Sequence, residues 1–213
     1  GVLFALGPAE AKQQYASTGT SIDQAAAVLK KKSLFEKRTR NLDLGGGKFN
    51  KGVEQLKKFG VNSRVLDDVP NEKGETNRSP EHNRAVIEWV NEEPVDTVTI
   101  ANVLNVIKEQ GARVNTLQRA FDAVKSGGKV YIQVYEGSRS GKGRFIVNKN
   151  GTRDWQNNKP LKAYLSDVRR VFSDAQIVNV EGTSIIVATK RHKENEIKRL
   201  GLPGVDSVHG VGK

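Results

Sequence analysis

A glycine-rich segment followed by acidic residues has the residue types and spacing that could bind a nucleoside. Segment 43–47 reads Asp-Leu-Gly-Gly-Gly and lies between a short predicted strand that starts at Asn41 and a helical pattern. Glycines there let a ligand approach the backbone closely, and the free N–H groups of the next helix face the same point. Asp67 and Asp68 follow about 20 residues later, where a carboxylate can accept hydrogen bonds from both ribose hydroxyls. The alternative is a turn that serves only packing, with Asp67 as a solvated strand end.

Other nucleotide-binding motifs fit the chain less well. The phosphate loop G-x-x-x-x-G-K-[ST] is absent, and Asn50 stands where the dinucleotide fingerprint requires its third glycine. A nucleotide-dependent oxidoreductase is therefore disfavoured, although it stays open as a function class.

Short apolar strands alternate with amphipathic helices around these motifs. The predicted strands are 41–44, 63–66, 97–101, 129–135, 176–180 and 183–189. The predicted helices are 25–32, 51–59, 81–91, 113–124 and 161–172, with polar loops at 69–80 and before residue 161. This order predicts an α/β fold, a Rossmann-like and mostly parallel sheet with helices on both faces and a C-terminal antiparallel β-hairpin.

Length and composition limit the classes of protein further. The 213 residues fit an N-terminal helical extension at 1–40, one main domain at 41–189 and a basic, flexible tail at 190–213. The absence of cysteine excludes disulfides and thiolate catalysis, and three widely separated histidines indicate no metal site. No apolar run approaches ~18 residues, so no membrane span is expected. The chain starts with Gly and lacks methionine, which indicates processing or excision from a longer protein.

The net charge of +11 is concentrated in one stretch. Segment 41–136 has a net charge of −1, whereas segment 137–170 has +7 and mixes cations with Phe145 and Trp155. Such a mixture suits phosphate contact and base stacking, so we expect nucleic acid or another polyanion as a partner. The predicted substrate-binding residues are Arg139, Lys142, Arg144 and Trp155. The alternatives are a basic face that only aids solubility, or a mobile lip that closes over a bound cofactor.

Several segments resemble class I S-adenosylmethionine (SAM)-dependent methyltransferases. Segment 43–47 resembles the D-x-G-x-G motif of this family and Asp67 its ribose-binding acid. Segment 96–104 resembles the fourth motif, and 125–132 the segment before the fifth strand. The resemblance covers 41–189 and implies SAM as the cofactor. The residues that it implies for cofactor binding are Asp43, Gly45, Gly46, Gly47, Asp67, Asp68, Ala101, Asn102 and Val103.

The resemblance also implies the kind of protein and the location in which the chain occurs. Segments 41–47 and 101–107 look like methyltransferase domains of phages and of large phage-associated multidomain proteins, in which a segment like 20–24 precedes the first motif. This implies a part of a larger polypeptide, located in the cytoplasm of a host cell or in a virion.

One departure from the family lies between Asp67 and the strand 97–101. This interval contains one helix and no clear strand, whereas the family usually has an edge strand there that contributes an adenine contact. Either the edge strand is lost, or the loop 69–80 replaces it.

Three residues near the carboxyl ends of predicted strands are candidates for catalysis. Methyl transfer requires a nucleophile held in line with the methyl group and, for some acceptors, removal of a proton. Asn102 could hydrogen bond to the cofactor or the acceptor, and Glu136 could act as a general base beside Tyr135. The alternatives are an aromatic wall for Tyr135 and a solvated strand end for Glu136.

Two kinds of DNA methylation are disfavoured because the residues that they require are absent from the sequence. No Asn/Asp-Pro-Pro-Tyr/Phe tetrapeptide occurs, which argues against methylation of exocyclic amines in DNA, and cytosine carbon-5 methylation needs a cysteine. The sequence therefore predicts a SAM-dependent methyltransferase that acts on a nucleic acid or a protein. The alternative is a non-catalytic module that kept the fold.

Overall fold

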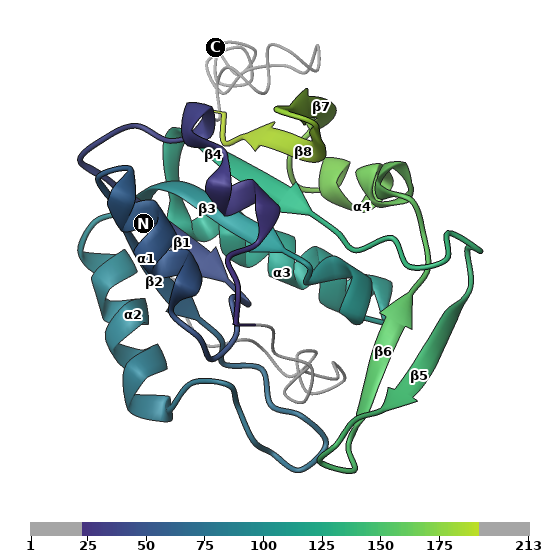
Figure 1. Cartoon of the computed structure of the whole chain (residues 1–213). Coiled ribbons are helices and arrows are strands. Elements are labelled where there is room, and N and C mark those ends of the chain that lie inside the picture. Colours follow the sequence, from purple (N-terminus) through teal and green to yellow (C-terminus); the bar gives the residue numbers. More distant parts are fainter. Residues whose placement is uncertain (1–22, 192–213) are drawn as a thin grey trace, which may run out of the picture.

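A six-stranded mixed sheet forms the centre of the protein (Figure 1). The computed structural model describes residues 23–191. The strands are β1 (Thr39–Leu44), β2 (Val61–Leu66), β3 (Val95–Ala101), β4 (Val124–Gln133), β7 (Gln176–Val180) and β8 (Thr183–Thr189). Their order is β2-β1-β3-β4-β8-β7; the first four are parallel, and β8 runs antiparallel to both β4 and β7. The predicted fold class is confirmed.

Helices cover both faces of this sheet. They are α1 (Lys51–Lys58), α2 (Pro80–Glu92), α3 (Gln110–Ala123) and α4 (Leu165–Arg169), with 3-10 helices η2 (Ala27–Lys30), η3 (Lys32–Leu34), η4 (Leu104–Val106) and η5 (Leu161–Tyr164). One apolar core joins α2, α3 and α4 to the strands, and a second joins η2 and α1 to the other side. In the part of the chain that the structure describes, no helix is long and apolar enough to cross a membrane.

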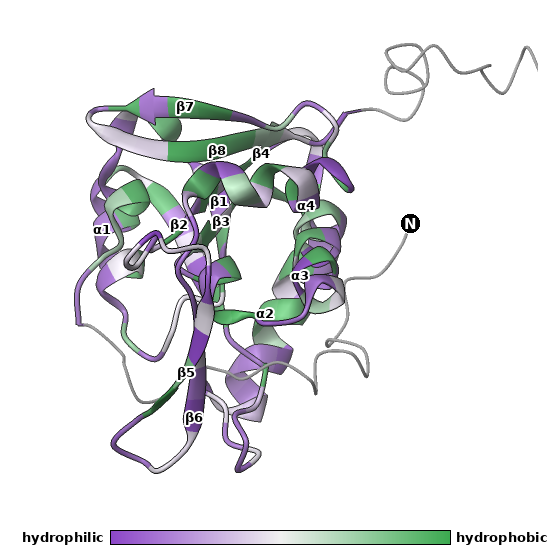
Figure 2. Ribbon diagram, turned by 90° about the vertical axis from the view of Figure 1, so that its right-hand side faces the viewer, coloured by the Kyte–Doolittle hydropathy of each residue, from purple (hydrophilic) through white to green (hydrophobic). Residues whose placement is uncertain are grey.

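A second, two-stranded sheet stands beyond the carboxyl ends of the central strands. It consists of β5 (Gly143–Val147) and β6 (Arg153–Asn157), which form an antiparallel hairpin. Figure 2 shows this hairpin projecting from the central sheet, with mostly hydrophilic residues along β6 and the adjoining turn. The prediction of a polar loop before residue 161 was therefore wrong, because the few apolar residues of the segment do not alternate in a way that indicates a strand.

Two predicted helices also differ from the structure. The segment 25–32 forms the 3-10 helix η2 and the first residue of η3 instead of an α-helix; Ala26 provides no side-chain cap, and Val28 and Leu29 are buried in the second core. Ser21, the start of the capping sequence, lies outside the described residues. The segment 161–172 forms η5 and the short α4 rather than one helix.

The ends of the other elements shift by a few residues. β4 begins directly after α3 and ends at Gln133, so Tyr135 and Glu136 lie beyond the strand that was predicted to contain Tyr135. The turn between β7 and β8 is confirmed: Glu181 and Gly182 have positive φ values of 49° and 85°, as a two-residue hairpin turn requires.

β2 is the edge of the central sheet on the side of the glycine segment. Between β2 and β3 the structure has a loop and α2, and no strand. The predicted absence of an additional edge strand is confirmed.

Candidate functional site

The glycine segment forms a tight turn between β1 and α1. Gly45 and Gly47 have φ values of 79° and 82°, a region that residues with side chains rarely occupy. A Cβ atom on Gly45 would lie 2.6 Å from Cγ2 of Val103, and one on Gly46 would collide with the carboxyl group of Asp43. The turn therefore has no space for a side chain at Gly45 or Gly46.

Asp67, at the end of β2, is joined directly to this turn. Its Oδ2 atom accepts hydrogen bonds from the backbone N of Gly47 at 2.8 Å and from Nδ2 of Asn77 at 3.2 Å. The residue is only 8% exposed, and burial raises the pKa of its carboxyl group. The glycine turn and the acid that the sequence selected thus form one unit.

Arg78 holds the same turn from the loop before α2. Its Nε and Nη2 atoms donate to the carbonyl oxygens of Gly47 and Phe49, both at 2.8 Å. Partial burial lowers the pKa of Arg78, and the nearby carboxylates of Asp67 and Asp43 act in the opposite direction. Sequence reasoning did not select Arg78, because its partners are backbone atoms about 30 residues away along the chain.

Asp43 lies beneath the turn in the interior of the sheet. Oδ1 of Asp43 accepts a hydrogen bond from the Thr99 hydroxyl at 2.9 Å, and the residue is 5% exposed. Burial raises the pKa of Asp43 to about 6, with the hydrogen bond from Thr99 and the charge of Arg78 acting in the opposite direction. Asp43 therefore releases its proton at a higher pH in the folded protein than in the unfolded chain.

Asp68, unlike its neighbour Asp67, forms an ion pair with an arginine. Both of its carboxyl oxygens accept hydrogen bonds from Arg119 on α3, at 2.9 and 2.7 Å, and both side chains are largely buried. The predicted cofactor residue Asp68 lines the same cavity as Asp67, but the ion pair takes up its two oxygens. Arg119 could not be paired with Asp68 from the sequence, because 51 positions separate them.

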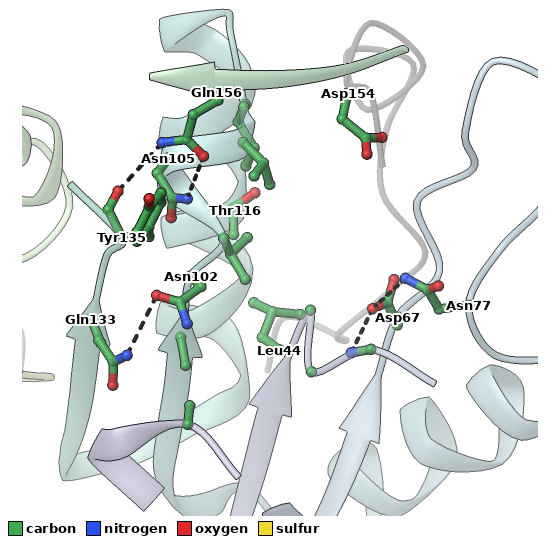
Figure 3. Close-up of a pocket in the computed structure, with 18 of the residues that line it drawn as sticks. Leu44, Asp67, Asn77, Asn102, Asn105, Thr116, Gln133, Tyr135, Asp154 and Gln156 are labelled. Carbon is green, nitrogen blue, oxygen red and sulfur yellow. Dashed lines mark hydrogen bonds between the residues drawn. The ribbon is translucent and has the colours of Figure 1, made fainter. Parts of the chain in front are cut away.

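These groups open onto one large cavity, shown in Figure 3. Its volume is about 1220 Å³, and its walls come from the ends of β1 to β4, from η2 and the residues before it, and from the β5–β6 hairpin. Small-molecule sites usually have about 300–1,000 Å³, so this cavity is larger than a typical site for one small ligand. The predicted residues that line it are Asp43, Gly45, Gly46, Gly47, Asp67, Asp68, Ala101, Asn102, Val103, Tyr135, Lys142, Arg144 and Trp155.

Asn102 follows β3 in a left-handed conformation, with a φ value of 60°. Its backbone N donates to the carbonyl of Gln133 at 2.8 Å, and its Oδ1 atom lies 3.4 Å from Nε2 of Gln133. Gln133 in turn accepts a hydrogen bond from the backbone N of Val28 at 2.8 Å. This polar chain fixes the wall opposite Asp67, and such strained backbone often occurs at functional sites. Sequence reasoning missed Gln133, which sits at the end of a strand like Asn102.

Of the other two catalytic candidates, one lines the cavity and the other does not. Tyr135 lines the cavity and is 61% exposed. Glu136 is not among the lining residues; its Oε2 atom accepts a hydrogen bond from the backbone N of Leu161 at 2.6 Å, and its Oε1 atom lies 3.8 Å from Nε of Arg139. Arg139 likewise lies outside the cavity lining.

The β5–β6 hairpin forms the upper wall of the cavity. Phe145 and Trp155 pack edge to face at 4.9 Å, and Lys108 lies 5.2 Å from both rings. The hairpin also supplies Asp154 and Gln156, which are 3% and 8% exposed and line the cavity. Neither was selected from the sequence, because the segment was read as a loop.

A further residue of the site that sequence reasoning missed is Asn105 in η4. Its Nδ2 atom donates to Oε1 of Gln156 at 3.3 Å, so η4 and β6 are joined across the cavity wall. Within residues 23–191, no three His, Asp or Glu side chains gather in an arrangement that could hold a metal ion.

The fold resembles that of solved SAM-dependent methyltransferases. A SAM-dependent methyltransferase from Methanosarcina mazei superposes with a TM-score of 0.50 at 11% identity, covering 80% of this chain and all of that one. The methyltransferase SibL in its apo form gives 0.42 at 17% identity, covering 73% of this chain and 51% of its own. Human N-acetylserotonin methyltransferase in complex with SAM gives 0.47 at 14% identity, covering 76% and 51%. The chain thus spans about half the length of SibL and of the human enzyme. No protein-family model and no curated protein sequence matches the chain.

Proposed function

We propose that this protein is a SAM-dependent methyltransferase. One observation carries the proposal: the backbone N–H of Gly47 in the glycine turn donates a hydrogen bond to the side chain of Asp67. Both residues lie where the parallel strands of a methyltransferase-type sheet end. The residues fit an adenosyl group: a carboxylate has further lone pairs for ribose hydroxyls, and the space beside the backbone of Gly47, where a Cβ atom would meet nothing within 4 Å, can take the methionine end. When bound, SAM supplies an activated methyl group.

The remaining cavity volume supports binding of an acceptor beside the cofactor. Asn102 and Tyr135 stand on the wall opposite Asp67 and would orient the acceptor, while the β5–β6 hairpin would exclude water from above. Orientation of this kind is the main contribution that a protein makes when the leaving group is already activated.

For the acceptor we propose a nucleic acid or a protein with an anionic surface. Lys142 and Arg144 line the cavity mouth beside Trp155, and Phe145 is 37% exposed. Cations interleaved with aromatic rings suit phosphate contact and base stacking. The phage context and the larger polypeptide stay predictions, and the similar solved structures do not support them.

Two measurements test the proposal. Calorimetric titration with SAM and with NAD should give saturable binding of SAM only; binding of NAD alone would identify an oxidoreductase. Transfer of a labelled methyl group should then be measured against DNA, RNA and lysate protein. For a nucleic acid acceptor, Lys142→Ala with Arg144→Ala should weaken binding and lower its salt dependence, since the slope falls by about 1 for each phosphate that a cation no longer neutralises.

A non-catalytic module is the second candidate. The observation that favours it is the position of Glu136, whose carboxyl group binds the backbone of Leu161 and does not line the cavity. Binding of SAM without methyl transfer to any of the three acceptor classes would support this candidate.

A further inference from the structure

Asp154 on β6 is a buried acid in the cavity wall that none of the roles above uses. It is 3% exposed, pairs in register with Ile146 of β5, and lines the cavity. Its Oδ1 atom lies 3.3 Å from Nδ2 of Asn148. Asn148 is itself fixed by the hairpin turn, since its Oδ1 atom accepts hydrogen bonds from the backbone N of Asn150 and of Thr152. The hairpin therefore holds this carboxyl group in a defined position.

The hairpin is fastened above the loop that follows Asp67. Arg153, next to Asp154, binds Glu72 twice: its Nε atom lies 2.7 Å from Oε1, and its backbone N lies 3.0 Å from Oε2. Lys73 adds a bond from Nζ to the carbonyl oxygen of Asn150 at 2.6 Å. Figure 3 shows the result, with Asp154 on the same side of the cavity as Asp67 and Asn77, and Asn102, Asn105 and Gln156 on the other.

The position of Asp154 relative to Asp67 indicates which part of a nucleoside it would meet. In the arrangement that we infer, a ribose held by Asp67 directs its base away from the glycine turn and toward the hairpin, because Asp154 lies on the same side of the cavity as Asp67 (Figure 3). No strand of the sheet lies beyond β2 on this side among the described residues, so the hairpin supplies the polar wall. A buried carboxyl group there accepts hydrogen bonds and repels carbonyl oxygens.

We propose that Asp154 accepts a hydrogen bond from the 6-amino group of the cofactor's adenine, so that the β5–β6 hairpin completes the nucleoside site at the open edge of the sheet. This rests on the proposed function, since it assumes an adenosyl ligand at Asp67. Adenine presents an amino group at position 6, whereas hypoxanthine presents an oxygen at the same place. A carboxylate accepts a hydrogen bond from the amino group but has no hydrogen to donate to the oxygen, so the site should prefer adenine.

The test compares S-adenosylhomocysteine with S-inosylhomocysteine, which differ in this group, by calorimetric binding to the full chain. The wild-type protein should bind the adenosyl compound about 10- to 100-fold more tightly. Asp154→Asn should reduce this preference to about 3-fold or less, because an amide can both accept from an amino group and donate to a carbonyl. Asp122→Asn, on the outer side of α3, is the matched control and should keep the wild-type preference.

The outcomes separate the two proposals. Equal affinity of the wild-type protein for both compounds would overturn the role of Asp154, whether or not the variant folds, and so would an unchanged preference in a folded Asp154→Asn. In either case binding of S-adenosylhomocysteine leaves the proposed function intact. Failure of the wild-type protein to bind either compound would overturn both proposals.

Discussion

Asp43→Asn tests the electrostatics of the site without any ligand. The folded-state pKa of Asp43 is raised from 3.8 to about 6, chiefly by burial. A raised carboxyl pKa means that the folded protein binds the proton more tightly than the unfolded chain does. The contribution of Asp43 to stability is therefore greatest below pH 3.8, is lost as the pH rises to about 6, and stays constant above. At about 1.4 kcal/mol per pKa unit, the total loss is about 3 kcal/mol.

Urea unfolding of the wild-type protein and of Asp43→Asn at pH 4.5 and pH 7.5, without cofactor, measures this loss. The amide keeps an oxygen to accept the Thr99 hydrogen bond but carries no charge. The stability of the variant relative to the wild type should thus rise by about 2 kcal/mol between the two pH values, the part of the total that falls in this window. Titrating groups that do not interact with Asp43 contribute equally to both proteins and cancel.

Asp122→Asn is the control for this measurement, because Asp122 lies on α3 outside the cavity lining and accepts a hydrogen bond from the Gln118 side chain on the same helix. It should retain the pH dependence of the wild type. The reasoning is refuted if Asp43→Asn also retains that dependence, since burial of the carboxyl group would then not raise its pKa.

The remaining predictions concern the turn, its acid and the buried ion pair. Asp67→Ala removes the acceptor for the Gly47 N–H and the ribose, so calorimetry should show about 10- to 100-fold weaker binding of S-adenosylhomocysteine; unchanged affinity would refute the ribose assignment. Gly45→Ala forces a side chain against Val103 at positive φ, so binding should be lost and only partly recovered by Val103→Ala. Arg119→Ala leaves Asp68 buried without its partner, and urea unfolding should show a loss of about 3–5 kcal/mol; a loss of less than about 1 kcal/mol would show that water reaches Asp68.

Glu136 shows that residue type and position in the sequence are not enough to predict whether a side chain reaches the cavity. A carboxylate a few residues past a strand could serve as a base, but whether its side chain enters the cavity depends on the course of the next segment. Here the chain returns at Leu161 and presents its N–H to the Glu136 carboxyl. Asp154, which does line the cavity, lies in a segment whose pairing as a hairpin has no clear periodic pattern in the sequence.

The sequence alone determined the parts of this protein that depend on neighbouring residues. The short strand expected at 41–44, the glycines and the helix after them predicted the turn, because the backbone there needs conformations that only glycine adopts easily. Asp67 could be chosen because parallel strands bring their carboxyl ends to one edge of the sheet.

Only the tertiary structure decided what these groups contact and which charges they carry. The pairing of Arg119 with Asp68, the support of Asn102 by Gln133 and the placement of Asp154 above Asp67 all join residues far apart in the chain. The raised pKa of Asp43 follows from burial beneath the turn. Burial and long-range contacts depend on how all the elements pack at once, and no local pattern of residue types specifies them.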